Sequence, residues 1–597
     1  MSQVSRVLVY LVRRDLRIAD NPVLHEISRL NTQSTRPFTH LLPVYIFPAN
    51  QIEVSGFLAR GEKKSPYPEA RSAVGGFWRC GKHRSKFIAE SVWDLKQDLE
   101  GLGSGLEIRV GSVKDVLSSI LAKYRQRTDV ELHGLWMTSE ESWEELQEEE
   151  IAQELAQQNH IDFKLWNDEK YFIDDRDLPH QQPSDLSDVF TTFRKTVEPL
   201  RNAPRKELPR PKSLPALPEF IPPQDSPFAI PTTLKATLEA LHKPLTKDVV
   251  DIPSMPEGVE SAHPFTGGSK AALERVRHLI EAGAMTAYKD TRNGLLGLNF
   301  STKLSAWLSL GCLTARQVHW QLMDFEDGKG EVGKSTAGYG KGESNGTTAV
   351  RFELLWRDYM RLCTRKFHGR LFYLGGYRQQ SEGVEPPRWK KPDAEILRRF
   401  LAGETGIGLI DASQRELLMT GWTSNRARQN VASFLAKHLG LDWRLGAEWY
   451  ESQLIDYDVS SNWGNWQYVA GVGNDPRGAA RVFNPVKQAL DYDPKGEYIR
   501  AWVPELRGVG ETDEDLLGVF QAWRLPQAEK KRLGLAGLNW VDKPLKRIDF
   551  SLNRRGGRGG RGEGGRGRGR GGGGRGRGRG DGREARSGPM EKAGWKG

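Results

Sequence analysis

The segment IDYDVSSNWGNWQY, residues 455–468, decides what kind of fold the sequence specifies. It brings aspartates, asparagines and large aromatic side chains together in one short stretch. A core helix would not accommodate the Asp, Asn and Gly, because buried polar groups need partners, and a solvent-exposed loop would not need two indoles. The segment therefore predicts the wall of a polar and aromatic site in the C-terminal half of the chain.

A helix expected at FELLWRDYMRL, residues 352–362, carries a similarly mixed face. The helical period places Glu353, Trp356 and Arg357 on the same side. A surface Glu–Arg pair beside a packed indole would produce the same pattern and would contribute only roughly 0.3 kcal/mol. This motif alone is therefore not decisive.

The segment GWTSNRARQNVASFLAKHLGLDW, residues 421–443, predicts a second helix of this kind, which Ser424 can cap. Its polar face includes Arg428, which can pair with Asp456 or Asp458. A buried pair of this kind needs further hydrogen bonds to be stable.

The charge of the chain is unevenly distributed. The 597 residues carry a net charge of +10, and residues 551–597, with 14 basic and 4 acidic side chains, account for all of it. The remainder is electrically balanced and offers no basic body as a reason to predict nucleic-acid binding. Three widely spaced cysteines fit an intracellular protein with reduced thiols and no metal site. The first apolar run is too short for a signal peptide, and no run is long enough for a membrane span.

Residues 5–175 alternate between apolar strands and amphipathic helices. VLVYLV (7–12) and LLPVYIF (41–47) are continuous apolar runs typical of buried parallel strands, and VKDVLSSILAKY (113–124) is typical of a helix that covers such a sheet. This order predicts a doubly wound α/β domain. No GxGxxG follows the first strand, so a conventional dinucleotide site is not indicated.

Four further regions are expected after this domain. The Pro-rich residues 176–268 predict a long connector rather than a folded unit. Residues 269–525 have helical periodicity and predict an all-α domain, with a mobile Gly/Ser/Lys-rich insertion at 327–348. Residues 526–552 are a C-terminal extension. The Arg-Gly repeats of 553–597 cannot bury a core and are expected to be disordered.

Long motifs closely resemble the photolyase/cryptochrome flavoprotein family. They are FELLWRDY, the stretch 421–468, YKDTRNGLLGLNFSTKLSAWLSLGCLTARQV (288–318) and RVFNPVKQALDYDPKGEYIRAWVPEL (481–506). TRNGLLGLNFSTKLS, Gln429 and Tyr468 resemble the DASH-type cryptochromes in particular, because many dimer photolyases carry Met and Trp at the last two positions. The Arg-Gly tail resembles that of some fungal members. The likeness covers about residues 5–525.

This resemblance implies an FAD folded inside the helical domain. Hydroxyls, backbone amides and a lysine in the run 301–305 suit a pyrophosphate, and an amide at Asn462 can donate to or accept from the flavin N5. The positions that the resemblance assigns to FAD are Tyr288, Ser301, Thr302, Lys303, Leu304, Ser305, Arg357, Arg428, Asp456, Asp458 and Asn462.

The resemblance also implies an electron-transfer chain of three tryptophans, Trp389, Trp443 and Trp466. Indole is oxidisable, so three indoles in series let an electron reach the flavin by short hops. Packing would explain any one of them. The coincidence of all three with the positions of the family chain favours electron transfer.

A pocket for a flipped pyrimidine dimer is implied as well. The positions assigned to it are Glu353, Trp356, Asn425, Gln429 and Tyr468, with Arg426 and Arg481 as phosphate contacts. Tyr468 has less stacking area than Trp and would recover less of the cost of flipping. This difference predicts a preference for single-stranded DNA.

An antenna pigment is expected between the domains, by resemblance 5,10-methenyltetrahydrofolate. Glu140 or Glu141, just after a predicted strand, corresponds to the acid that binds the pterin. Acids at this place also commonly cap helices, and both interpretations stay open.

The sequence therefore predicts a monomeric, intracellular blue-light flavoprotein that repairs cyclobutane pyrimidine dimers by electron transfer, preferentially in single-stranded DNA. One alternative is a signalling photoreceptor that uses the same photochemistry. Another is an RNA-binding protein in which the Arg-Gly tail dominates. Nucleus, cytoplasm and an organelle are all compatible with the sequence.

Overall fold

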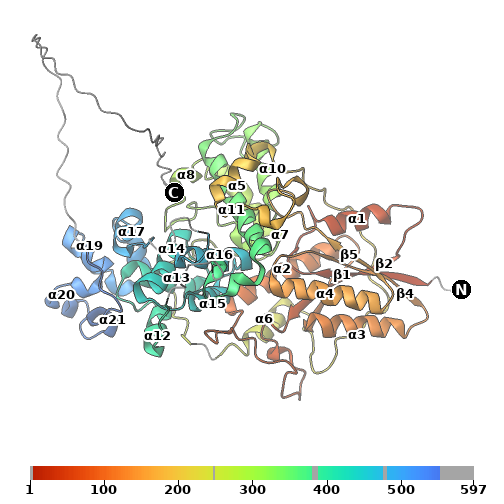
Figure 1. Ribbon diagram of the computed structural model, residues 1–597, viewed down its shortest axis with the longest axis horizontal. Helices are drawn as coiled ribbons and strands as arrows, with labels where there is room; N and C mark the ends of the chain where they lie inside the picture. The colour runs from red at the N-terminus through yellow and green to blue at the C-terminus, as the bar shows by residue number, and fades with distance from the viewer. Residues whose placement is uncertain (1–3, 247–248, 379–387, 475–480, 551–597) are drawn as a thin grey trace, which may run out of the picture. The chain divides into compact units, whose positions relative to one another are not determined.

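The structure is a computed structural model that describes residues 4–246, 249–378, 388–474 and 481–550. The chain divides into a large unit, Met1–Ile548, and a second unit, Asp549–Gly597. Figure 1 shows the helices and strands of the large unit. The Arg-Gly tail 553–597, expected to be disordered, lies outside the described residues.

A five-stranded parallel sheet forms the centre of the N-terminal half. Its order is β3-β2-β1-β4-β5, so the direction of winding reverses next to the central strand β1. Residues 7–12 of β1 are almost fully buried, because strands flank β1 on both sides and other elements pack over the side chains on the faces of the sheet. This order confirms the predicted doubly wound domain. The strands are β1 (Ser5–Val12), β2 (His40–Pro48), β3 (Glu107–Gly111), β4 (Val130–Thr138) and β5 (Asp162–Trp166).

Helices cover the sheet, and α3 and α4 share one apolar core with it. The first helix was not predicted, although Asn21 caps it with Pro22 at its first position. The bounds are α1 (Pro22–Asn31), α2 (Lys82–Glu100), α3 (Val113–Arg125) and α4 (Trp143–Gln158).

The Pro-rich residues 176–268 are more ordered than the expected connector. They contain α5 (Phe190–Val197) and α6 (Leu234–His242), and α6 packs against α2. The Arg109 guanidinium donates to the Pro222 carbonyl at 2.7 Å, which ties this segment to the α/β domain. Its partners are far away in the chain, so local sequence could not reveal the packing.

The C-terminal half is helical, as predicted, and the long helix α11 lies against α5, α8, α10 and α16. The bounds are α7 (Ser269–Glu281), α8 (Tyr288–Thr291), α9 (Ser305–Ser309), α10 (Ala315–Glu326), α11 (Asn345–Phe367), α12 (Ala394–Ala402), α13 (Gly408–Thr420), α14 (Asn425–Ser433), α15 (Trp443–Gln453), α16 (Val459–Ala470), α17 (Pro485–Tyr492), α18 (Glu497–Trp502), α19 (Asp513–Phe520), α20 (Gln527–Arg532) and α21 (Asn539–Asp542).

Two regions of uncertain order in the sequence are anchored. In the insertion 327–348, the Thr336 hydroxyl donates to the Glu281 carbonyl at 2.9 Å. In the extension 526–552, the Leu545 amide donates to the Thr405 carbonyl at 2.9 Å.

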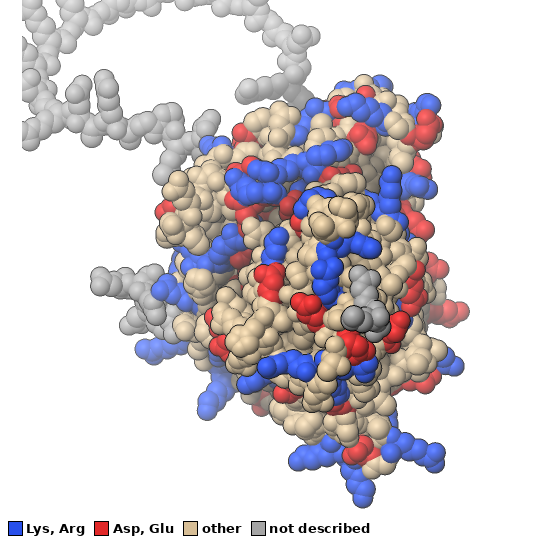
Figure 2. All heavy atoms as spheres, turned by 90° about the vertical axis from the view of Figure 1, so that its right-hand side faces the viewer, with Lys and Arg blue, Asp and Glu red and all other residues tan. Residues whose placement is uncertain are grey.

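Buried ion pairs and hydrogen bonds join the two halves. Arg17 pairs with Asp168 at 2.5 Å inside the α/β half, and the same guanidinium donates to the Gly311 carbonyl of the helical half at 3.2 Å. Figure 2 shows basic and acidic side chains interspersed over one face of the folded body, consistent with its balanced charge.

Candidate functional site

Asp456 is the node of the candidate cofactor site. It lies in the turn between α15 and α16, and its Oδ2 accepts from Ser305 Oγ at 2.6 Å and from Arg428 Nη2 at 2.9 Å. Its Oδ1 is buried and has no protein partner. The structure thus brings together three predicted residues from three separate segments, and leaves one carboxylate oxygen in need of a donor.

Arg357 has a buried, unpaired donor, the complement of the unpaired acceptor of Asp456. Its Nη2 donates to the Leu308 carbonyl at 2.8 Å, whereas its Nη1 is buried without a protein partner. An unpaired buried acceptor at Asp456 and an unpaired buried donor at Arg357 fit a ligand that carries both donors and acceptors, as FAD does.

The run 301–305 has an unusual backbone. Ser301 and Lys303 both adopt positive φ, 61° and 57°, a strained conformation for residues with side chains, and such strain clusters at ligand clamps. Leu304 and Ser305 then start the short helix α9. Thr302 belongs to the same predicted clamp, and its carbonyl accepts from Arg275 Nε at 3.1 Å.

The Lys303 side chain is buried against the loop that precedes it. Its Nζ donates to the carbonyls of Gly297 at 3.0 Å, Leu298 at 3.1 Å and Phe300. Burial lowers its pKa to about 7, and the Arg275 charge adds to this effect. The ammonium therefore holds the loop 297–300 in place.

Asp458 and Asn462 organise helix α16. Asp458 is its N-cap and accepts from the Ser461 amide at 2.7 Å. Asn462 follows one turn later, and its Nδ2 donates to the Ala447 carbonyl at 2.9 Å. Asp458 thus has a demonstrable capping role, and the amide of Asn462 is held in place by α15.

The predicted tryptophans lie on adjoining elements. Trp466 in α16 and Trp443 at the start of α15 are buried, and α15 packs on α16. A Cβ on Gly446 would lie 2.1 Å from Cη2 of Trp466, so only glycine leaves room for this indole. Trp389 is half-buried, and the Lys390 amide after it donates to the Gly440 carbonyl at 2.8 Å. Its segment therefore lies beside the segment that leads into Trp443.

Helix α14 joins the cofactor site to the candidate substrate pocket. Arg426 Nη1 donates to Gln429 Oε1 at 3.1 Å, and its Nε donates to Asn293 Oδ1 at 2.8 Å. Two residues further along the same helix, Arg428 holds Asp456. Asn425 begins the helix and is exposed.

Glu353 has a partner that sequence reasoning missed. Arg292 Nη1 donates to Glu353 Oε1 at 2.7 Å. Desolvation raises the pKa of the Glu353 carboxyl, and the charge of Arg292 opposes this rise. Arg292 and Asn293 lie four and five residues after Tyr288 in the quoted motif YKDTRNGLL, and the only signal there was their position in the motif.

Trp356 and Tyr468, two further residues assigned to the substrate pocket, each have a neighbouring side chain close to the ring. Trp356 is stacked on Phe190, with ring centroids 3.6 Å apart and planes at 13°, so one face of the indole is already covered. Tyr468 lies near Arg481, whose guanidinium is 5.9 Å from the phenol ring. The structure therefore brings Tyr468 and Arg481 together, and covers one face of the Trp356 indole with Phe190.

The two candidate antenna acids form ion pairs. Glu140 binds Lys170, and Glu141 binds Arg361 at 3.1 Å and Arg365 at 2.8 Å. Arg361 and Arg365 lie on α11, so Glu141 joins the α/β half to the helical half. Ser142, rather than either acid, occupies the N-cap position of α4, and its side chain makes no capping hydrogen bond.

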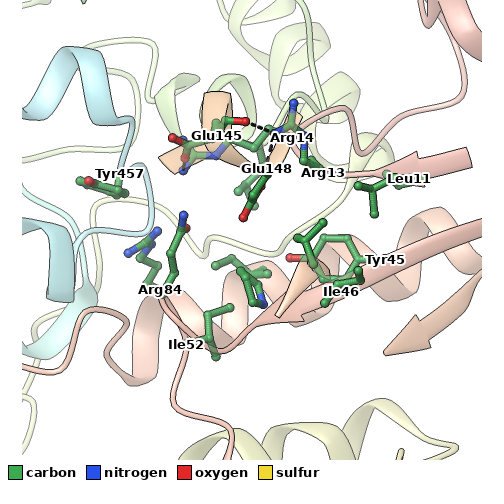
Figure 3. A pocket seen from close by; sticks show the side chains of 16 residues that line it. Leu11, Arg13, Arg14, Tyr45, Ile46, Ile52, Arg84, Glu145, Glu148 and Tyr457 are labelled. Carbon is green, nitrogen blue, oxygen red and sulfur yellow. Dashed lines mark hydrogen bonds and ion pairs between the residues drawn. The ribbon is translucent and has the colours of Figure 1, made fainter. Parts of the chain in front are cut away.

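A small cavity opens at the carboxyl end of β1 and β2 (Figure 3). Arg13, Arg14, Glu148 and Tyr457 line it, and its volume is about 60 Å³. Burial raises the pKa of Glu148 to about 7, against the pull of Arg13. Ligand pockets usually enclose roughly 300 Å³ or more, so these side chains would have to move to admit a pigment.

Metal clusters and membrane-spanning helices are both absent from the described part of the chain. Among residues 4–246, 249–378, 388–474 and 481–550, no group of three or more His, Cys, Asp and Glu side chains could hold a metal ion. Within the same residues, every helix is too short or too polar to cross a bilayer.

Comparisons with known proteins agree with this geometry. The family model described as DNA photolyase matches residues 8–213, and the one described as the FAD binding domain of DNA photolyase matches residues 350–543. A Neurospora crassa protein named as a mitochondrial cryptochrome DASH is 51% identical over 92% of this chain and 76% of its own length. A cryptochrome DASH of Gibberella zeae is 52% identical over 93% of this chain and 80% of its own length.

Solved structures share the fold. A Synechocystis cryptochrome superimposes with a TM-score of 0.72 at 32% identity, over 90% of this chain and 95% of that one. A class III photolyase of Agrobacterium tumefaciens, at 22% identity and a TM-score of 0.65 over 91% and 94% of the two chains, shares the fold alone. With its sheet, its FAD-binding domain and these relatives, the chain belongs to the photolyase/cryptochrome family, among the cryptochromes DASH.

Proposed function

We propose that this protein is a light-driven flavoenzyme that repairs cyclobutane pyrimidine dimers and prefers them in single-stranded DNA. The observation that carries the proposal is the double role of α14. Arg428 holds Asp456 in the candidate cofactor site, and Arg426 and Gln429 form a hydrogen-bonded pair beside Glu353 and Arg292. One helix is then the wall between cofactor and substrate.

When bound, FAD supplies the light-excited electron that splits the dimer. The chain's own residues bind and orient the two partners. Asp456, Arg428 and Ser305 hold one another in position to receive the cofactor, with Oδ1 of Asp456 left to accept from it. Asn462, fixed by the Ala447 carbonyl, would face the reactive part of the flavin.

On the substrate side, Glu353 would hydrogen-bond the edge of a flipped pyrimidine. Its carboxylate, which Arg292 holds in place, can accept from the N–H of a pyrimidine ring. The face of Trp356 opposite Phe190 would stack on the base, a contact worth roughly 1–3 kcal/mol in comparable sites. Arg426 and Arg481 would position the backbone phosphates.

The preference for single strands rests on Tyr468. Photolyases flip their target base, at a cost of about a few kcal/mol in duplex and least in an unpaired strand. A phenol at this position offers less stacking area than an indole and recovers less of that cost. Matched oligonucleotides with one thymine dimer, single-stranded or annealed, test this preference under blue light and in darkness.

Faster light-dependent repair of the single strand supports the proposal, and equal rates on both substrates contradict the preference. Absence of repair from a flavin-loaded protein that still photoreduces would instead favour a signalling photoreceptor. Purified protein that retains no FAD would contradict both functions.

We propose RNA as the partner of the Arg-Gly tail, residues 553–597. The tail carries a high density of arginines, which bind phosphates and stack on bases. Loss of RNA affinity on deletion of 553–597, with repair unchanged, supports this role. Unchanged affinity assigns RNA binding to the folded body or to neither.

We also propose that the protein binds a folate antenna pigment. To bind the pterin, Glu140 or Glu141 would have to give up the ion pair with its present basic partner. Otherwise the pigment would bind through other residues. Near-ultraviolet absorbance of the purified protein, before and after Glu141→Gln, tests the assignment. We propose the mitochondrion as the first compartment to examine, because the Neurospora crassa relative is named as mitochondrial. A fluorescent fusion of the full chain tests this location.

A further inference from the structure

Trp463 contacts the electron-transfer chain, although it was not among the three tryptophans assigned to that chain. It lies in α16 and is buried, and its ring meets that of Trp443 edge to face, with centroids 5.8 Å apart and planes at 82°. Aromatic rings at this separation are in van der Waals contact. Trp443 therefore has an indole neighbour outside the assigned chain.

The indole N–H of Trp463 has a defined partner. It donates to the Tyr457 hydroxyl at 3.2 Å, whereas the indole N–H of Trp389 is buried without a partner. Loss of an electron makes an indole N–H strongly acidic and positively charged. A hydrogen bond from this group is then charge-assisted and favours the oxidised ring. Trp463 has this stabilisation in the described structure, and Trp389 lacks it.

The surroundings of Tyr457 keep the positive charge from moving further. The Arg84 guanidinium lies 4.2 Å from the centroid of the Tyr457 ring, which disfavours a positive charge there. Burial raises the pKa of Tyr457 well above its usual range, so the phenol stays protonated. Phe372, 4.9 Å from Trp463, is not readily oxidised. Among these neighbours, Trp463 is the group on which an oxidising equivalent would rest.

We propose that Trp463 is a redox-active branch of the tryptophan chain. Trp466 gives one electron to the light-excited flavin, Trp443 gives one to the oxidised Trp466, and Trp463 gives one to the oxidised Trp443. One electron has then reached the flavin and one positive charge resides on Trp463, while its N–H proton stays in the hydrogen bond to Tyr457. The positive charge on Trp463 is neutralised when an external thiol supplies an electron or when the electron returns from the flavin. This inference rests on the proposed function, because that function supplies the electron acceptor.

Light-induced tryptophan radicals in the flavin-loaded full chain test the branch. Transient absorption and electron paramagnetic resonance would compare Trp389→Phe, Trp389→Phe with Trp463→Phe, and Trp389→Phe with Trp502→Phe. Trp502 is an equally buried indole in α18, which packs against α13 and α19, and serves as the control. Flavin content and thermal unfolding show whether each variant is folded.

We expect Trp389→Phe to retain a long-lived tryptophan radical, which the added Trp463→Phe change removes and the added Trp502→Phe change does not. Loss of the radical in Trp389→Phe alone would overturn the branch, as would a radical that survives in Trp389→Phe with Trp463→Phe. Absence of any tryptophan radical in the flavin-loaded wild type would instead count against the assigned chain and the proposed function.

Tyr457→Phe is a second variant that keeps every indole. In the Trp389→Phe background it removes the hydrogen bond from Trp463, and the radical should then decay about tenfold faster, as expected for loss of one charge-assisted hydrogen bond. An unchanged decay in this variant would overturn the role given to the Trp463–Tyr457 contact.

Discussion

Arg428 and Asp456, 28 residues apart in the chain, form an ion pair with a distance of 2.9 Å between Nη2 and Oδ2. The Arg428 Nε also donates to the Thr423 carbonyl at 2.9 Å. The pair therefore ties the start of α14 to the turn that precedes α16. The helix that would border the substrate and the helix that carries Trp466 are held to each other through it.

Asp456→Asn should lose FAD. The amide cannot balance the charge of Arg428, and removal of one member of a largely buried pair costs about 3 kcal/mol. We expect at least a tenfold smaller fraction of flavin-loaded protein, by the ratio of flavin to protein absorbance. Asp442→Asn is the matched control, because it weakens the partly exposed pair with Arg444 at 2.8 Å outside the candidate site. Normal flavin content in Asp456→Asn would contradict the site.

Gly446→Ala should displace Trp466. The added methyl would meet Cη2 of that indole at 2.1 Å, and such overpacking costs about 1–3 kcal/mol. Flavin photoreduction should slow together with the loss of stability, as measured by illumination kinetics and chemical denaturation. Gly369→Ala is the control, because a Cβ there would meet no atom within 4 Å. Equal effects of the two changes would show that Gly446 has no special role in making room for Trp466.

Stability should fall at acid pH through Asp175. Burial raises the pKa of Asp175, but Arg361 at 2.6 Å and Arg365 at 2.8 Å outweigh burial and lower it to about 2. A depressed carboxyl pKa stabilises the fold above the unfolded value of about 3.9 and loses this contribution as pH falls towards 2. The contribution is about 2 kcal/mol.

Urea unfolding of the wild type and of Asp175→Asn measures this contribution. The difference in free energy of unfolding should be largest at pH 6 and shrink as the pH approaches 3. A difference that stays constant over this range would show that Asp175 does not titrate as proposed.

Tyr468→Trp should shift repair towards duplex DNA. The larger ring gains stacking area against the flipped dimer, and we expect the duplex rate relative to the single-strand rate to rise about threefold. Tyr468→Phe keeps the ring area and should leave this ratio unchanged. If Trp and Phe give the same ratio, the stacking explanation of strand preference is wrong.

The sequence by itself determined the two halves of the fold. The apolar runs at 7–12 and 41–47 specify buried parallel strands, and the helical period of 352–362 and 421–443 specifies amphipathic helices, because such patterns act over a few neighbouring residues. The helices and packing of 176–268 were not predicted, since that segment is held by partners far away in the chain.

The sequence also named the side chains of the candidate site, through long motifs that resemble a family. Only the tertiary structure decided what each of them contacts. It paired Asp456 with Arg428 and Ser305, turned Lys303 towards loop carbonyls, covered one face of Trp356 with Phe190, and set Trp463 against Trp443. These contacts join segments that are distant in sequence, and their geometry depends on how whole helices pack, which no local pattern encodes.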